Sequence, residues 1–226
     1  MKYTAIIPCA GSGSRVNATI AKQYLSIGNK TILEHTLVQF LQSAMIEQII
    51  LVVSPDDNQA QNYVNISGKI KLLYCGGETR AQTVYNALTN EAFIEDEWIL
   101  VHDAARCCIT TKMIDDMINQ LKDDEVGGIL ALPAKDTILQ AQDGIIKLSL
   151  PRKQIYLAQT PQMFRYQVLL DALSSSDLTQ ITDESSAVVA HGNLVHIIEG
   201  SHSNLKITYP EDLELASFYL GKQGRL

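Results

Sequence analysis

Cysteine is scarce in this sequence, and the four cysteines are not spaced to form a recognised site. Cys9 and Cys75 are isolated, while Cys107 and Cys108 are adjacent. They show neither the C-x-x-C pairs of a zinc site nor the density of a disulfide-stapled domain. The five histidines are scattered and predict no metal ligands. We therefore expect a chain that folds without disulfides in a reducing compartment, the cytoplasm.

Long apolar runs and an excess of positive charge are also missing. No run reaches the roughly 20 residues of a membrane span. Strand-like sequence begins almost at once, so we expect no signal peptide. The net charge is −7 and the isoelectric point is near 5.2. This balance argues against a nucleic acid or an anionic membrane as the partner, although a local basic pocket can still bind a small anion.

Apolar runs of strand length alternate with helical stripes in the first part of the chain. Residues 49–53, 98–102 and 128–133 predict buried strands, and stripes over 31–41 and 113–121 predict helices. This alternation indicates a single α/β domain, residues 1–226, with a mostly parallel sheet. The elements expected later are a turn at 159–162, a helix to about 173, a helix opening at 182–185, strands near 194–198 and 205–208, and a closing helix from 210.

The alternation stops at residues 136–158. Apolar residues on both sides of Asp143-Gly144 predict a β-hairpin, because this residue pair is typical of two-residue turns. A hairpin with no helix after it exposes apolar surface, and a second copy of the chain is a common cover. We therefore expect a β-arm at about 136–158 that forms a homodimer. Arg152, expected on the return strand, either reaches the neighbouring subunit's site or is an exposed arm residue.

A glycine-rich loop follows the first expected strand. The apolar run breaks after Ala10 into Gly11-Ser12-Gly13-Ser14, where the missing side chains let backbone N–H groups approach a phosphate. Arg15 and Lys22 place two cations beside it. The loop lacks the third glycine of a dinucleotide fingerprint and the Gly-Lys-Ser/Thr of a P-loop. The sequence thus predicts a polyphosphate site, with a plain glycine turn as the alternative.

Two further polar clusters follow expected strands. Gly76-Gly77-Glu78-Thr79-Arg80 is one, after a strand expected at 71–74, and Asp103 with Arg106 is the other, after the strand expected at 98–102. The carboxyl ends of parallel strands share one edge, so both clusters are expected near the first glycine loop. Asp103 is suited to a metal or ribose and Arg106 to a phosphate; a simple turn and a surface ion pair are the alternatives. Lys206, in the expected strand 205–208, indicates a sheet edge or an anion site.

Together these motifs resemble one family, the 2-C-methyl-D-erythritol 4-phosphate cytidylyltransferases of non-mevalonate isoprenoid synthesis. Each segment is weak alone, and the specificity lies in their shared order and spacing. The segments are Pro8-Cys9-Ala10-Gly11-Ser12-Gly13-Ser14-Arg15, Lys22-Gln23-Tyr24, Gly76-Gly77-Glu78-Thr79-Arg80, Val101-His102-Asp103-Ala104-Ala105-Arg106, Lys135-Asp136-Thr137, Gln159-Thr160-Pro161-Gln162, Thr182-Asp183-Glu184, Lys206-Ile207-Thr208 and Pro210-Glu211-Asp212.

The resemblance implies a Rossmann-like nucleotidyltransferase fold, a three-layer sandwich with a mostly parallel sheet and a projecting β-arm that pairs two subunits. It implies transfer of a cytidylyl group from CTP to methylerythritol phosphate, with release of pyrophosphate and with Mg²⁺ as cofactor. The acceptor phosphate attacks the α-phosphorus in line, so charge on the phosphoryl oxygens must be neutralised.

The resemblance also implies roles for individual residues. Arg15 and Lys22 stabilise the transition state, while Lys206, and Arg152 from the partner subunit, aim the acceptor phosphate. CTP is bound by Ala10, Gly11, Gly13, Gly77, Glu78 and Thr83. The acceptor is bound by Asp103, Arg106, Thr137, Thr160 and Thr182. No metal ligands are implied.

Three positions depart from the family pattern. Cys9 replaces the usual alanine, Ser14 replaces a frequent basic residue, and Cys107 replaces a common proline, a change expected to loosen the loop that holds Arg106. None of them removes a group with an implied chemical role. A ribitol 5-phosphate cytidylyltransferase is the nearest alternative, although the Asp103–Arg106 and Thr182–Glu184 segments favour methylerythritol phosphate. A dinucleotide-dependent oxidoreductase is disfavoured by the missing glycine, and a non-catalytic nucleotide sensor by the paired cations.

Overall fold

The structure is a computed structural model that describes residues 1–11 and 20–226. A seven-stranded sheet crosses this part of the chain in the order β11-β7-β10-β6-β1-β4-β5. Only β10 among these strands runs antiparallel to its neighbours, which confirms the mostly parallel sheet. The strands are β1 (Tyr3–Pro8), β4 (Gln48–Val52), β5 (Ile70–Leu73), β6 (Trp98–Val101), β7 (Gly127–Pro133), β10 (Tyr156–Arg165) and β11 (His196–Glu199).

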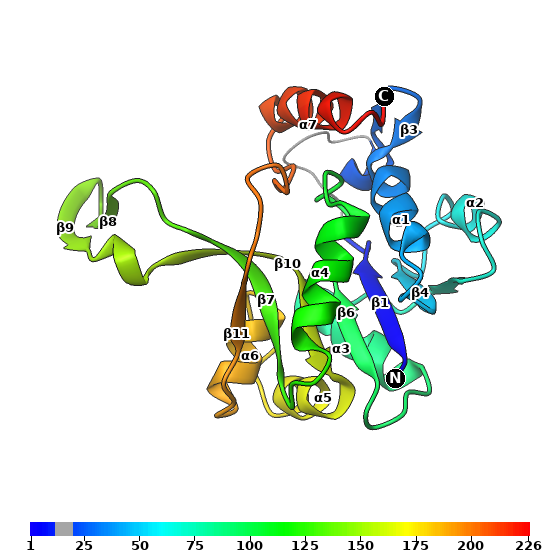
Figure 1. The fold of residues 1–226 in the computed structure, drawn as a ribbon, viewed down its shortest axis with the longest axis horizontal. Helices are drawn as coiled ribbons and strands as arrows, with labels where there is room; N and C mark the ends of the chain where they lie inside the picture. Colours follow the sequence, from blue (N-terminus) through cyan, green and yellow to red (C-terminus); the bar gives the residue numbers. More distant parts are fainter. Residues whose placement is uncertain (12–19) are drawn as a thin grey trace.

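Helices cover both faces of the sheet and complete three layers (Figure 1). α1 (Ile32–Gln42) and α4 (Thr111–Leu121) pack on one face, and α3 (Arg80–Asn90), α5 (Tyr166–Ser174) and α6 (Glu184–Ala190) on the other. A capping box begins α1, with Glu34 N–H donating to the Thr31 hydroxyl at 3.1 Å. The smaller pieces and the closing helix are η1 (Lys22–Tyr24), β2 (Ser26–Ile27), β3 (Lys30–Thr31), α2 (Gln61–Val64) and α7 (Glu211–Lys222).

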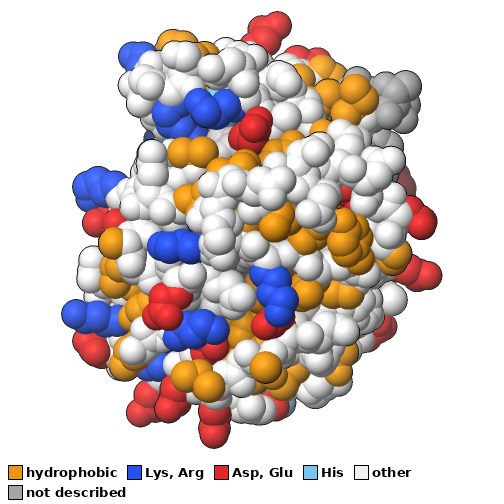
Figure 2. All heavy atoms as spheres, turned by 90° about the vertical axis from the view of Figure 1, so that its right-hand side faces the viewer, with side chains coloured by type: hydrophobic (Ala, Val, Ile, Leu, Met, Phe, Trp, Pro, Cys, Tyr) orange, Lys and Arg blue, Asp and Glu red, His pale blue; other side chains and the backbone are white. Residues whose placement is uncertain are grey.

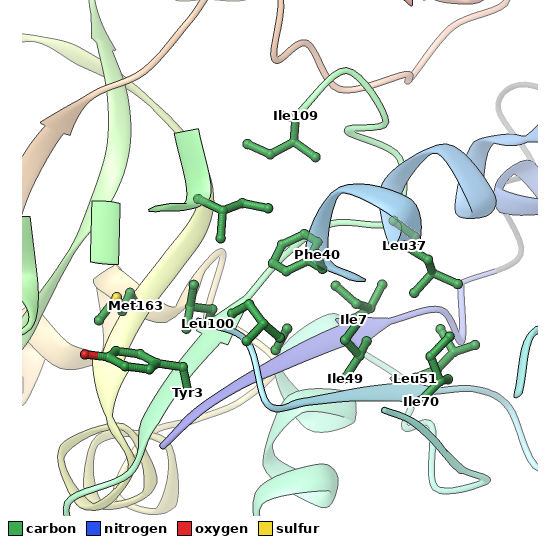
Figure 3. Packing of buried hydrophobic residues seen from close by; sticks show 14 of the residues in the cluster. Tyr3, Ile7, Leu37, Phe40, Ile49, Leu51, Ile70, Leu100, Ile109 and Met163 are labelled. Carbon is green, nitrogen blue, oxygen red and sulfur yellow. The ribbon is translucent and has the colours of Figure 1, made fainter. Parts of the chain in front are cut away.

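The centre of the sheet is buried on both faces. Ile7, Ile49 and Leu100 face α1 and α4, where they meet Phe40 and Met163 (Figure 3). Their chain neighbours face the other layer, because successive strand side chains point to opposite sides. Ile7, Ile49, Leu100, Phe40 and Met163 are fully buried, and each contributes roughly 1.5–3 kcal/mol of burial free energy. The strands therefore form a rigid frame, and the loops at their carboxyl ends are held by it.

The expected hairpin is confirmed. β8 (Ile138–Gln142) and β9 (Ile145–Leu150) form an antiparallel pair that projects from the ends of β7 and β10 (Figure 1). Asp143 and Gly144 have φ values of 52° and 77°, as a two-residue turn of this kind requires. Arg152 lies in a short 3₁₀ segment, η2 (Arg152–Gln154), rather than on the return strand.

Two expectations for the later part of the chain are wrong. Residues 159–162 are not a turn but part of β10, whose register against β7 shifts between Ala158 and Gln162. The shift accommodates Pro161, which has no N–H for a regular ladder, and the Thr160–Pro161 peptide is cis. Residues 205–208 are not a strand. They are held by separate hydrogen bonds, among them Ile207 N–H to the Ala105 carbonyl at 2.9 Å.

Charge is mixed on one face of the molecule. On the face that carries α1 and α2, acidic and basic side chains alternate with apolar ones (Figure 2). In the described ranges, no helix has both the length and the apolar character needed to cross a membrane.

Candidate active site

A cleft of about 360 Å³ opens at the carboxyl ends of β1 and β6, beside the start of α3. This is the edge at which open α/β sheets bind ligands. Eight of the predicted site residues line it: Ala10, Gly11, Lys22, Gly77, Glu78, Thr83, Asp103 and Lys206. Arg15 and Gly13, which were also predicted here, lie outside the described residues.

The two glycine turns meet at one wall of this cleft, as the sequence suggested. A Cβ atom on Gly76 would come within 2.3 Å of Ala10 Cβ and 2.8 Å of the Val53 carbonyl oxygen, so only glycine fits. The Gly77 N–H donates to the Thr83 hydroxyl at 3.0 Å, and that hydroxyl donates to the Thr79 carbonyl at 2.9 Å. The Thr83 hydroxyl therefore bridges Gly77 and Thr79 and fixes the conformation of the second turn.

Lys22 is fixed beside the first turn. Its Nζ donates to the Ile207 carbonyl at 2.8 Å. The next two residues anchor the segment: Gln23 Nε2 donates to the Cys9 carbonyl at 2.8 Å, and the Tyr24 hydroxyl donates to Asp57 Oδ2 at 2.6 Å. A cation held in this way needs little reorganisation to meet an anionic ligand.

Asp103 is the centre of a charge cluster on another part of the cleft wall. Its Oδ1 lies 2.7 Å from Arg80 Nε, and its Oδ2 lies 2.8 Å from Lys206 Nζ and 3.6 Å from Arg106 Nε. Burial alone would raise the pKa of this carboxyl, but Arg80, Lys206 and Arg106 outweigh burial and hold it well below its usual range. With the buried Glu184, the cluster contains three cations and two carboxylates. Its net positive charge suits an anionic substrate.

Thr160 lies behind Asp103. Its hydroxyl oxygen accepts the Asp103 N–H at 3.0 Å and lies 3.0 Å from His102 Nδ1. Burial lowers the pKa of His102 to about 3, so the ring is neutral. His102 Nε2 faces the Arg106 carbonyl at 3.3 Å and must carry the proton, so Nδ1 accepts the Thr160 O–H. The hydroxyl of Thr160 thus positions the Asp103 loop.

Thr137 and Thr182, two predicted acceptor-binding residues, do not line this cleft, and neither does Arg152, which was predicted to aim the acceptor phosphate in the partner's site. Thr137 and Thr182 are exposed, the first just before β8 and the second just before the N-cap of α6. Arg152 is exposed at the base of the arm, where its guanidinium donates to the Lys135 carbonyl at 2.7 Å.

Sequence reasoning missed the part played by Arg80 and Glu184. Arg80 lines the cleft and forms ion pairs with Asp103 and Glu184, 23 and 104 positions away in the chain. The signal for Glu184 was hidden because Thr182-Asp183-Glu184-Ser185 is a good helix N-cap, and Asp183 does cap α6. Cys107, which was expected to loosen the Arg106 loop, is fully buried in the cluster that contains Ala216 of α7.

Comparison of this chain with known proteins identifies its family. The family model described as 2-C-methyl-D-erythritol 4-phosphate cytidylyltransferase matches residues 3–222. The chain belongs to this family.

Its relatives in the family cover it nearly end to end. The protein named 2-C-methyl-D-erythritol 4-phosphate cytidylyltransferase from Thiobacillus denitrificans is 41% identical over 231 residues, which is 98% of this chain and 99% of that protein. The protein of the same name from Chromobacterium violaceum is 43% identical, over 94% of this chain and 95% of its own length. The crystal structure of the Francisella tularensis 2-C-methyl-D-erythritol 4-phosphate cytidylyltransferase is similar with a TM-score of 0.84 and 37% identity, covering 97% of this chain and 100% of that chain.

Proposed function

We propose that this protein transfers the cytidylyl group of CTP to 2-C-methyl-D-erythritol 4-phosphate, giving 4-diphosphocytidyl-2-C-methyl-D-erythritol and pyrophosphate. Membership of the family supports the reaction. The observation that carries it is the lining of the cleft, which combines two glycine turns and Lys22 with the Asp103 cluster. The part of the wall with the glycine turns suits a nucleoside triphosphate, and the part with the Asp103 cluster suits a second phosphate.

The nucleotide occupies the wall formed by the two glycine turns. Backbone groups of these turns read the edge of the cytosine and hold the phosphates, and the side chains of Glu78 and Thr83 complete the wall. Lys22 and Arg15 neutralise the charge that develops on the phosphoryl oxygens as the bond to pyrophosphate breaks. The nucleotide residues proposed are Ala10, Gly11, Gly13, Gly77, Glu78 and Thr83.

The acceptor occupies the part of the wall with the Asp103 cluster. Lys206 and Arg106 attract its phosphate, and Asp103 keeps both cations in place. The phosphate is already ionised, so it attacks the α-phosphorus directly and needs neither a general base nor a covalent enzyme intermediate. Thr160 acts through the Asp103 loop, whereas Thr137 and Thr182 contact the acceptor only if the arm and the α6 segment complete the site.

Mg²⁺ is proposed as the metal, and the substrate phosphates are its main ligands. Within residues 1–11 and 20–226, no group of three or more His, Cys, Asp or Glu side chains could hold a metal. Both oxygens of Asp103 are engaged by cations, so this carboxylate fits at most as one ligand. Magnesium commonly binds through phosphates, waters and one or two carboxylates, and it would neutralise phosphate charge here.

The β-arm is proposed to form a homodimer, as part of one nucleotidyltransferase domain. Four of its apolar side chains are 47–61% exposed: Leu139, Ile145, Ile146 and Leu148. A patch of this kind on a projecting hairpin is normally covered by another chain, and a twofold pair of arms covers both copies. The arm carries Arg152 away from its own cleft, which supports a role in the partner's site. We also propose the cytoplasm as the location, since all four cysteines are free thiols.

The reaction is tested by pyrophosphate release from purified protein with CTP and magnesium. Methylerythritol phosphate and ribitol 5-phosphate are compared in parallel reactions. We expect release with the first and at most a trace with the second. Release with ribitol 5-phosphate alone would refute methylerythritol phosphate as the acceptor and leave cytidylyl transfer as the reaction. CTP binding without pyrophosphate release in either reaction would refute the proposal that the protein is a cytidylyltransferase.

The cross-subunit role of Arg152 is tested by mixing two inactive variants, Lys22→Ala and Arg152→Ala, under conditions that exchange subunits. If Arg152 serves the partner's site, each mixed dimer has one complete site. We then expect about a quarter of the parental rate, because half of the dimers are mixed and one of their two sites works. If Arg152 serves its own subunit, no mixed dimer has a complete site and no activity returns.

A further inference from the structure

Arg80 joins three segments of the chain at the cleft. It is the first residue of α3, directly after the second glycine turn. Its Nε donates to Asp103 Oδ1 at 2.7 Å, and its NH1 donates to Glu184 Oε1 at 2.7 Å. Asp103 follows β6, and Glu184 is the first residue of α6. One guanidinium therefore links the second glycine turn, the Asp103 loop and α6, the helix that begins just after Thr182.

The ion pair between Arg80 and Glu184 is costly to bury. Glu184 is fully buried, and its Oε2 has no hydrogen-bond partner within the described part of the chain. Arg80 NH2 is likewise buried without one. Buried ion pairs often stabilise a fold no better than apolar side chains of similar volume. The pair is thus better explained by what it positions than by the stability it adds.

The contact fixes the orientation of Asp103. Because Arg80 occupies Oδ1, only Oδ2 is turned toward Lys206 and Arg106. Without Arg80, the carboxylate could turn both oxygens to these two cations and draw them away from an incoming phosphate. A guanidinium can hold two carboxylates at once through its planar fork, which an ammonium cannot do in the same geometry.

We propose that Arg80, anchored by Glu184, is a positioning residue that orients Asp103 so that Lys206 and Arg106 hold the acceptor phosphate in line with the nucleotide. The inference rests on the proposed function and adds a residue to it. It predicts that loss of Arg80 weakens the use of the acceptor far more than the binding of CTP.

The test is the double variant Arg80→Met/Glu184→Leu, which removes both charges and leaves neither unpaired. We expect it to fold with a melting temperature close to that of the parent. Its kcat/KM for methylerythritol phosphate should fall about 10–100-fold with a raised KM for that substrate, while CTP affinity by calorimetry changes less than about threefold. Arg80→Lys keeps the positive charge but loses the planar fork, so its kcat/KM for methylerythritol phosphate should fall by a smaller factor.

Arg165 supplies the matched control. Its guanidinium donates to the Asp124 carbonyl at 2.9 Å and lies 4.0 Å over the Trp98 ring, at the opposite end of β6. Arg165→Lys should lower the melting temperature without changing the KM for the acceptor.

A folded double variant with parental kcat/KM for the acceptor would overturn the proposal. If the double variant does not fold, Arg80→Lys decides alone, and parental kinetics in that variant overturn the proposal equally. The affinity for methylerythritol phosphate, measured by calorimetry with a non-hydrolysable CTP analogue, gives a readout without turnover. An inactive parent whose acceptor affinity still falls on Arg80→Lys would refute the proposed reaction and leave the positioning role supported.

Discussion

Replacing Lys22 with alanine is expected to lower kcat by about 100–1000-fold, the effect of removing one fixed charge from a transition state. Lys22 lines the cleft and its Nζ is held at 2.8 Å from the Ile207 carbonyl, so the ammonium is already in place when phosphoryl charge develops. The KM values should change much less than kcat, because the contact strengthens only as the bond to pyrophosphate breaks. Steady-state pyrophosphate release measures both.

Lys69 offers a control that matches this contact. Its Nζ donates to the Ile46 carbonyl, also at 2.8 Å, and it does not line the cleft. Lys69→Ala should keep the parental kcat. A Lys22→Ala variant with kcat within about threefold of the parent would remove Lys22 from the mechanism.

Asp103→Asn is expected to damage both folding and acceptor use. The substitution leaves Arg80, Arg106 and Lys206 around a neutral amide, and breaking a buried ion pair on one side costs about 3–5 kcal/mol of unfolding free energy. The free energy of unfolding at neutral pH, from urea titration, should fall by an amount of this order. The kcat/KM for methylerythritol phosphate should fall by more than about tenfold, because the cations are no longer held apart.

The same variant predicts a pH dependence. The pKa of Asp103 in the folded protein lies well below its usual range, while an aspartate in the unfolded chain has a pKa of about 3.9. The stability that this carboxylate contributes is therefore complete above about pH 5, and it is lost as the pH falls below about 4. The difference between parent and variant should be constant from neutral pH to about pH 5 and then shrink by about 1.4 kcal/mol per pH unit below about pH 4.

An exposed carboxylate separates this effect from a general loss of charge. Asp116 pairs with Lys112 on the surface of α4, so Asp116→Asn should change neither the stability nor the kinetics. A stability difference for Asp103→Asn that did not shrink down to pH 3 would show that Asp103 is not the titrating group.

The sequence predicted the elements that local patterns determine. Apolar runs gave β1, β4, β6 and β7, and Asp143-Gly144 gave the hairpin, because period and turn residues act over a few positions. It also predicted that the two glycine turns meet, since strand ends in a parallel sheet share an edge. These predictions needed no knowledge of distant contacts.

The predictions that failed depend on distant contacts. Residues 159–162 contain a proline and looked like a turn, but β6 and β7 on either side draw them into a strand. Residues 205–208 looked like a strand, but Lys22 and Ala105 take the hydrogen bonds that a neighbouring strand would have made. Arg80 was passed over for the same reason, since its value depends on a carboxylate 104 positions later.

The place of β10 between β6 and β7 also sets the order in which the sheet can form during synthesis. β1, β4, β5 and β6 pair with one another, so this half can assemble once residue 101 has left the ribosome. β7 pairs only with β10 and β11 among the described strands and cannot close the open side of β6. That side stays unpaired until residue 165 emerges, about 3–13 s later at 5–20 residues per second. During this interval the nascent chain carries a bare strand edge, and the segment returning from the arm is what finally covers it.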